Sequence, residues 1–472
     1  MRDTESGVTR IAKLFVSMIL ALTLKFFKPE VDPFSIIGIG LFIFFGLAFF
    51  YKLGKGIPVR ELIILIALIQ WVIAPIVSYH FFTNSEFYYM IIDESRYMNF
   101  VIPATLGLVA GLMFPLRKPI EHNEQGKTEN PEYYFKRGRV IFGIGIVSLL
   151  IKPFMPVSLA YFILLLSYSA MLGAFYILKA NARYKYIILV AAFAPIFVGA
   201  AESSVFHEMF IWGGFLLIMY TYINKSALLS KTLLFSGMVA FIFIINSVKK
   251  DYREVVWADK NQSQSQFPGQ EKTAGKGNTG QLIGLVNEKV NKSGIQSDYY
   301  QEFTDRLNQG WIIARIMYVV PEYEDFAHGE TIMEGIYAAL LPRFLSPNKA
   351  MSGGAKNFER FTGLALAGAS MNLGIVGEAY ANYGKTNGLV FMFIYGLFFN
   401  VVYWIILKRA QHKSEYLLWL PFLFFYVIKA EEDFTSIFNQ FVKSVIVMAM
   451  LFYLLNMFVN EDPFIKNKAE IK

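Results

Sequence analysis

Repeated apolar runs divide the sequence, and they decide what the chain can fold into. Most runs are roughly 18 to 25 residues long, enough for an α-helix to cross about 30 Å of hydrocarbon. A helix also satisfies its own backbone hydrogen bonds, as lipid requires. Hydrophobic residues make up 55% of the chain and charged residues only 17%, which is more apolar than a soluble domain needs. The sequence therefore predicts an all-α, polytopic membrane helix bundle.

The apolar runs predict about twelve transmembrane helices. They cover residues 11–28, 34–51, 60–80, 99–116, 139–153, 156–178, 186–201, 204–223, 232–248, 386–408, 415–431 and 434–459. The first run is followed by KFFKPEVDP without a small-residue cleavage site, so we expect it to be an anchor and not a removed signal peptide. Three regions follow from this pattern: about nine spans in 1–248, a large polar loop in 249–385, and three spans with a tail in 386–472.

Basic residues in the short loops predict the orientation, because Lys and Arg mark the cytoplasmic side. Those that fall on one side under this assignment are Lys52, Lys55, Arg60, Arg117, Lys118, Lys136, Arg137, Arg139, Arg183, Lys185, Lys225, Lys231, Lys408, Arg409 and Lys413. Both termini are then expected to be cytoplasmic, and the large loop is expected on the outer face.

The large loop changes composition three times. Residues 259–280 are rich in Gln, Ser, Gly and Lys and cannot form a core, which predicts a mobile flap. Residues 298–320 have helical periodicity. Residues 331–344 hold an apolar run too short to span the bilayer, which fits a re-entrant or interfacial segment.

Three arginines stand out in these parts of the loop. Arg306 and Arg315 would lie on opposite sides of one straight helix, so only a bend at Gly310 would let both face one ligand. Arg343 lies at the tip of the short apolar segment, beside the helix-breaking Pro342.

Unusual polar clusters also gather on the predicted outer face. They are IIDESRYMNF around Arg96, GAAESSVFHEMF around Glu202 and His207, VKKDYREVVW, and KAEEDFTSIFNQF around Glu432. Ionisable residues at a membrane boundary are expensive to bury and therefore indicate a functional site. The competing interpretation is that each is a solvated anchor at a helix end.

Absent residues exclude several chemistries. The chain has no Cys, which excludes thiolate catalysis, disulfides and Cys-based metal sites. Its five His residues form no HxxxH or HExxH spacing, and no GxxxxGK[ST] motif occurs. We therefore expect no Cys- or His-based metal site and no cofactor, which leaves a divalent cation at Glu432 and Asp433 as the open alternative. Any energy must come from the substrate or a gradient.

Arginine and lysine at a membrane surface suit a lipid diphosphate, whose tails stay in the bilayer. The candidate diphosphate or substrate ligands are Arg96, Glu202, His207, Lys249, Lys250, Arg253, Arg306, Arg315, Lys349, Tyr380, Asn382, Glu432 and Asp433. Arg343 and Glu378 are the candidate catalytic residues. If a glycosyl group is transferred, a carboxylate must accept the proton of the acceptor hydroxyl, and Glu378, Glu202, Glu432 and Asp433 are candidates. Glu378 has the alternative role of capping a helix start.

The motifs LLPRFLSPNK, SVKKDYR and IVGEAYANYGKTNGLVFMFIYG resemble the bacterial Wzy-type oligosaccharide repeat-unit polymerases of O-antigen, exopolysaccharide and enterobacterial-common-antigen synthesis. The plan of many spans and one large late external loop is similar too. An Arg-x10-Gly pattern of some members fits Arg343 and Gly354. The external His of the related O-antigen ligases has only the isolated His328 as a counterpart.

This resemblance implies a glycosyltransferase-C-like bundle in the bacterial inner membrane with its site facing the periplasm. The implied activity transfers a growing glycan from polyprenyl diphosphate to another lipid-linked repeat unit, without a nucleotide sugar. Its partners would be polyprenyl-diphosphate-linked oligosaccharides, the lipid bilayer and a chain-length regulator, and no nucleic acid is implied. The alternatives are a ligase-like glycan transferase, a transporter or flippase of lipid-linked glycans, and a non-catalytic membrane partner.

We expect the Arg343→Ala variant to abolish polymer and leave single-repeat products, because a fixed cation stabilises the leaving diphosphate. Chain length is measured on glycans extracted from cells that carry the variant. An unchanged chain-length distribution would count against this assignment of Arg343.

Overall fold

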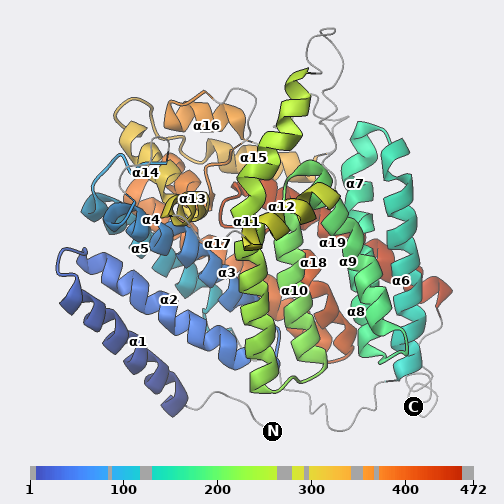
Figure 1. Ribbon diagram of the computed structural model, residues 1–472. Coiled ribbons are helices and arrows are strands. Elements are labelled where there is room, and N and C mark those ends of the chain that lie inside the picture. The colour runs from blue at the N-terminus through green and yellow to red at the C-terminus, as the bar shows by residue number, and fades with distance from the viewer. Residues whose placement is uncertain are drawn as a thin grey trace. The chain divides into compact units, whose positions relative to one another are not determined.

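Every regular element in the described part of the chain is helical. The computed structural model describes residues 7–82, 88–116, 130–262, 279–291, 297–341, 354–365 and 371–459. Within these ranges, extended pairing is limited to an isolated bridge between Leu53 and Gly56. The structure therefore confirms the predicted all-helical class (Figure 1). Several of the helices are apolar enough for a bilayer.

The helices follow in a simple order along the chain. They are α1 (Gly7–Phe27), α2 (Pro33–Lys52), α3 (Val59–Leu68), the π-helical turn η1 (Ile69–Ile73), α4 (Ala74–His80), α5 (Glu94–Leu112), α6 (Pro131–Ile151), η3 (Lys152–Phe154), α7 (Val157–Ser167), α8 (Ser169–Lys179), α9 (Lys185–Ser203), α10 (His207–Ile223), α11 (Leu228–Gln262), α12 (Thr279–Asn291), α13 (Ser297–Leu307), α14 (Gly310–Val319), α15 (Glu330–Leu340), α16 (Ala355–Thr362), α17 (Ile375–Ala410), the 3-10 helix η5 (Ser414–Trp419), α18 (Leu420–Leu423) and α19 (Phe434–Phe458).

Seven helices in the described ranges are long and apolar enough to cross a membrane. They cover Pro33–Lys52, Val59–His80, Leu159–Lys179, Lys185–Ser203, Leu228–Lys249, Ile375–Ala410 and Phe434–Met457. Each overlaps a run that the sequence predicts. The runs at 11–28, 99–116, 139–153 and 204–223 form α1, α5, α6 and α10, which fall outside this set. Twelve spans therefore stay a prediction.

The predicted span at 415–431 is wrong, because this segment is not one helix. It forms the short η5 and α18 and then a series of turns. Its apolar side chains are buried, with Trp419 and Phe424 fully enclosed. A backbone surrounded by protein can bond to its neighbours and does not need a continuous helix.

Residues Ser414–Asp433, which we call the broken segment, run back along α17. Ser414 follows the end of α17, whereas the backbone N–H of Phe434 donates to the carboxylate of Glu378 in the first turn of α17 (2.6 Å). The residues between Ser414 and Phe434 therefore run from one end of α17 to the other. A neighbouring helix satisfies part of their backbone, since the indole N–H of Trp71 donates to the carbonyl of Ala430 (3.3 Å).

The chain forms two compact units. Unit 1 comprises Met1–Lys52, Pro58–His122 and Thr304–Ile446. Unit 2 comprises Leu53–Ile57, Asn123–Phe303 and Val447–Lys472. The part of the polar loop that follows Thr304 thus packs with the helices of unit 1.

The core of unit 1 depends on close packing between α5 and α17. A Cβ added at Gly396 would lie 2.6 Å from the carbonyl oxygen of Leu108, and one added at Gly107 would lie 2.8 Å from that of Leu389. Gly111 meets the backbone of α17 even more closely. Small residues of this kind let apolar helices approach backbone to backbone.

In unit 2, a glycine allows similarly close packing between α6 and α8. A Cβ at Gly138 would lie 2.8 Å from Ile177 and 2.9 Å from Tyr176. The neighbouring Arg137 is fully buried, with its guanidinium 4.7 Å from the centre of the Tyr133 ring and hydrogen-bonded to Asn456.

The helical region predicted at 298–320 is interrupted just before Gly310, where a bend was the condition for Arg306 and Arg315 to face one ligand. α13 ends at Leu307 and α14 begins at Gly310. Gly310 is needed for space, because a Cβ there would lie 2.7 Å from the Tyr97 hydroxyl. In the predicted flap, residues 259–262 continue α11, and residues 263–278 lie outside the described ranges.

We expect Gly111→Ala to destabilise the protein by about 1–3 kcal/mol, because the new methyl would displace the backbone of α17. The matched control is Gly46→Ala in α2, where a Cβ has open space and Ala has the better helix propensity. Thermal unfolding of both purified variants in detergent measures the difference. Equal midpoints for the two would contradict the packing role of Gly111.

Candidate functional site

A buried carboxylate joins three helices of unit 1. Glu378 lies in the first turn of α17 and is almost fully buried. One of its oxygens accepts a hydrogen bond from the Thr331 hydroxyl of α15 (2.5 Å), and the other accepts from the backbone N–H of Phe434 at the start of α19 (2.6 Å). Both oxygens are thus engaged within the protein.

A kink in α17 creates the surroundings of this carboxylate. Gly384 has φ +66° and ψ −160°, which interrupts the helix and frees the carbonyls of the preceding turn. The segment before α15 takes up two of them. The N–H of Ala327 donates to Ala381, and the N–H of His328 donates to Asn382, each at 3.0 Å.

Asn382 completes the junction and is fully buried. Its amide nitrogen donates to the Thr331 hydroxyl (2.8 Å) and to the backbone carbonyl of Glu378 (2.9 Å). Its amide oxygen accepts from the N–H of Gly329 (3.0 Å). Glu378, Thr331 and Asn382 thus form one closed network that fixes the start of α15 against α17.

The broken segment ends in three acidic residues, 431–433, which we call the acidic segment and which lie next to this network. Asp433 caps α19, because its carboxylate accepts from the backbone N–H of Ser436 (2.7 Å). Its other oxygen faces Gly354, where an added Cβ would lie 3.2 Å from it and 2.9 Å from the Asn372 amide oxygen. Asp433 and Asn372 therefore approach the same point at the start of α16.

Glu432 is held by an amide and a lysine. Its side chain is 15% exposed, and it accepts a hydrogen bond from the Asn372 amide nitrogen (2.6 Å). The ammonium of Lys429 lies 3.5 Å from its other oxygen. Lys429 is itself buried, with its ammonium 3.6 Å from the centre of the Tyr426 ring.

A π-helical turn faces the same acidic segment. The turn Ile69–Ile73 interrupts the long helix α3–α4, and such turns occur frequently at functional sites. Its Gln70 donates through the amide nitrogen to the carboxylate of Glu431 (2.9 Å). The carbonyl of Gln70 accepts from the backbone N–H of Gln309, between α13 and α14 (3.1 Å).

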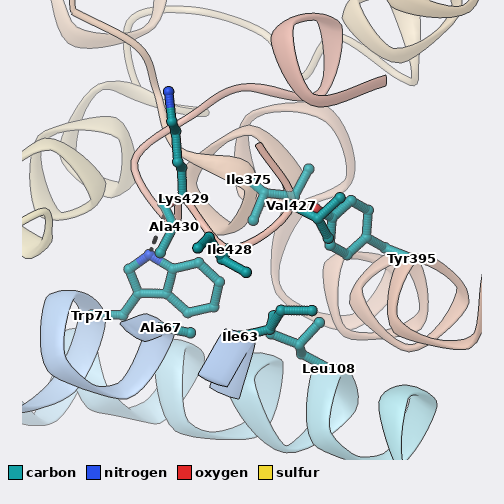
Figure 2. Close-up of a pocket in the computed structure, with 10 residues that line it drawn as sticks. All are labelled: Ile63, Ala67, Trp71, Leu108, Ile375, Tyr395, Val427, Ile428, Lys429 and Ala430. Carbon is teal, nitrogen blue, oxygen red and sulfur yellow. Dashed lines mark hydrogen bonds between the residues drawn. The ribbon is translucent and has the colours of Figure 1, made fainter. Parts of the chain in front are cut away.

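The contact between the π-helical turn and the broken segment is mostly apolar. Figure 2 shows the Trp71 indole bonded to the Ala430 carbonyl, with the side chain of Lys429 extending away from the apolar side chains. A cavity of about 10 Å³ here has room for no more than one water molecule. Its lining residues are Ile63, Ala67, Trp71, Leu108, Ile375, Tyr395, Val427, Ile428, Lys429 and Ala430.

Three amide oxygens around the acidic segment accept no hydrogen bond within the part of the chain that the structure describes. They belong to Gln70, Gln309 and Asn372. Buried polar atoms are normally satisfied, so such atoms call for water or a ligand that donates hydrogen bonds.

Burial changes the protonation of the acidic segment. It raises the pKa of Glu432 from 4.5 to about 7, although the nearby Lys429 ammonium opposes this. Burial also raises the pKa of Asp433, and its hydrogen bonds with Ser436 oppose that rise. Glu432 can therefore exchange a proton near neutral pH.

Two predicted arginine ligands belong to the same unit. Arg96 on α5 donates to the carbonyl of Met317 (2.9 Å), and Arg315 on α14 donates to the hydroxyl of Tyr89 (3.1 Å). Their described hydrogen bonds thus go to neutral acceptors. Tyr380 is half-buried.

Arg306 and Arg360 also belong to unit 1, and Arg360 is not among the predicted ligands. Arg306 is half-buried in the last turn of α13. Arg360 on α16 forms ion pairs with Glu324 (2.6 Å) and Glu330 (2.9 Å), which raise the pKa of its guanidinium. Arg360 thus has a structural role between α16 and the start of α15.

Other predicted ligands lie in unit 2. Glu202 is exposed in the last turn of α9, His207 begins α10, and Lys249 is half-buried on α11. The hydroxyl of Tyr252 donates to the Ala201 carbonyl (2.7 Å) and joins α11 to the end of α9. The predicted diphosphate ligands are therefore divided between the two units.

The remaining predicted ligands are outside the described side chains. Lys250 and Arg253 lie on α11, but only their backbone is described. Arg343 and Lys349 lie outside the described residues.

No protein-family model matches this chain, and no curated protein or solved structure is significantly similar to it.

Sequence reasoning did not single out several residues of the site. Gln70 is the one amide in the apolar run ILIALIQWVIAPI, and a single polar residue in such a run could have identified it as a candidate. Lys429 is the first residue of the KAEED motif, whose Glu432 and Asp433 are among the predicted ligands. Thr331 and Asn372 carry no local signal, because their partners are distant in the sequence.

We expect Glu432 to contribute a fall in the stability of the protein between about pH 4.5 and about pH 7, because it loses its proton in a largely buried site. The pKa in the folded state lies above that in the unfolded state, so the folded state binds the proton more tightly and its advantage disappears as pH rises. Glu432→Gln should flatten this part of the profile, whereas the exposed control Glu359→Gln should not. Thermal unfolding in detergent at several pH values tests this, and identical profiles for both variants would contradict it.

Proposed function

We propose that the chain is a glycosyltransferase that polymerises lipid-linked oligosaccharide repeat units at one surface of the bacterial inner membrane. The geometry of the non-helical segment Lys429–Asp433 supports this proposal most: the carboxylate of Glu432 is 15% exposed and lies 3.5 Å from the ammonium of the buried Lys429, just before α19. Burial also raises the pKa of Glu432. Transfer of a glycosyl group to a hydroxyl needs a group that accepts the hydroxyl proton.

We assign the base to Glu432. It is partly exposed, and its pKa near neutrality suits proton transfer at physiological pH. Glu378 is less suitable, because it is almost fully buried, whereas the side chain of Glu432 is 15% exposed. The role of Glu378 in this proposal is to hold the turn before α19 in place.

The reaction follows from this assignment. The acceptor hydroxyl attacks the anomeric carbon of the donor glycan, and Glu432 takes its proton. The bond from that carbon to the diphosphate oxygen breaks, and polyprenyl diphosphate leaves with its electron pair. Arg96 and Arg315, whose described hydrogen bonds go to neutral groups, would attract the diphosphate together with Arg306 and Arg343.

A transporter of lipid-linked glycans is the second candidate. The broken segment Ser414–Asp433 and the π-helical turn at Gln70 favour it, because transporters bind substrates at interrupted helices. The positions of Glu378 and Asp433 favour a site at the membrane surface, as a polymerase needs, because the two residues lie at the starts of α17 and α19 and not in the middle of these helices.

We expect a strain that lacks this gene to accumulate single repeat units on polyprenyl diphosphate. Mass analysis of extracted lipid-linked intermediates, with the glycan side determined by access to an impermeant glycosidase, distinguishes the candidates. Single repeats on the outer face indicate a lost polymerase, and repeats retained on the inner face indicate a lost transporter. Finished polymer that stays on the lipid indicates a ligase, and unchanged intermediates would refute all three.

We expect Glu432→Gln to reduce polymer formation by about 10²–10⁴-fold, the usual contribution of a general base. Glu359→Gln is the matched control, because it removes an exposed carboxylate of the same unit. Both are expressed in the deletion strain at equal membrane levels and compared by polymer yield. Full activity of Glu432→Gln would contradict the assignment.

A further inference from the structure

Helix α15 presents an apolar stripe to its surroundings. Met333, Tyr337 and Leu340 are 47%, 58% and 61% exposed. Their spacing places them on one face of the helix. A stripe of three large exposed apolar side chains on one short helix needs a partner.

The opposite face of α15 is fixed to the unit. Thr331, Ile332, Gly335 and Ala338 are buried. A Cβ added at Gly335 would lie 2.9 Å from both the Phe434 ring and the Thr435 hydroxyl oxygen. α15 therefore packs directly on the first turn of α19.

The length and position of α15 favour the bilayer as the occupant of its stripe. The helix has 11 residues, or about 16 Å, and cannot cross the hydrocarbon layer. It lies where the candidate span α19 begins, and farther along α19 Val445 and Ile446 are exposed as well. α15 therefore lies at the end of a helix that is long and apolar enough to enter a bilayer.

We propose that α15 is an interfacial helix whose apolar stripe lies among the outer acyl-chain segments of the bilayer. Tyr337 suits this boundary, where one end of a side chain is apolar and the other is wet. Glu334 is exposed beside the stripe and would face the headgroups. This placement holds whether the protein polymerises or transports glycans.

Helix α15 also connects the bilayer surface to the candidate site. Thr331 begins the same helix and donates to Glu378, so α15 fixes the buried network at a set depth below the headgroups. A lipid-borne substrate could then approach the site laterally along α15.

The absence of Cys makes the proposal directly testable, because one introduced thiol is unique in the chain. Tyr337→Cys, Met333→Cys and the control Glu334→Cys are labelled with a fluorescent nitrobenzoxadiazole and reconstituted in phosphatidylethanolamine–phosphatidylglycerol vesicles. The vesicles contain lipids with a nitroxide at carbon 5 or carbon 12 of the acyl chain. Native unfolding midpoints of the labelled proteins confirm that they are folded.

We expect the carbon-5 nitroxide to quench the probes at 333 and 337 at least twofold more than the probe at 334, and more than the carbon-12 nitroxide does. Stronger quenching from carbon 12 would overturn the proposal in favour of a re-entrant segment. Weak, equal quenching at all three positions would place α15 in water. Disulfide cross-linking of Tyr337→Cys between two copies would assign the stripe to self-association and also overturn it.

Discussion

The hydrogen bonds of one buried carboxylate hold unit 1 together around its candidate site. Glu378 accepts from Thr331 on α15 and from the backbone of Phe434 on α19, while it belongs to α17 itself. Leaving either donor unpaired in an apolar interior would cost about 1–3 kcal/mol. The relative placement of these three helix starts therefore depends on this side chain.

The irregular backbone around the site follows from the same need to satisfy polar groups. The kink at Gly384 exposes carbonyls that the 327–329 segment binds, and the π-helical turn leaves the Gln70 carbonyl to Gln309. The broken segment before α19 is stable because protein surrounds it. These departures from ideal helices lie close together in unit 1, as is common where a protein binds or transforms a ligand.

The sequence predicted the helical class and several elements well, because apolar length and periodicity are local properties. The candidate spans overlap predicted runs, and α13 and α14 cover most of the region 298–320, where the sequence has helical periodicity. The segment 415–431 was misjudged, because its composition alone cannot show that protein and not lipid surrounds it. The acids of KAEED were recognised, but their partners Asn372 and Gln70 are set by contacts between distant segments.

The proposed function places the segment Lys429–Asp433 in the active centre of a glycan polymerase. The most direct measurement is reconstitution of the purified protein in vesicles with lipid-linked single repeats extracted from the deletion strain. Mass spectrometry then follows the number of repeats per lipid over time. We expect a ladder of longer glycans and released polyprenyl diphosphate with the native chain, and neither with Glu432→Gln. A folded native protein that leaves every glycan at one repeat would contradict it.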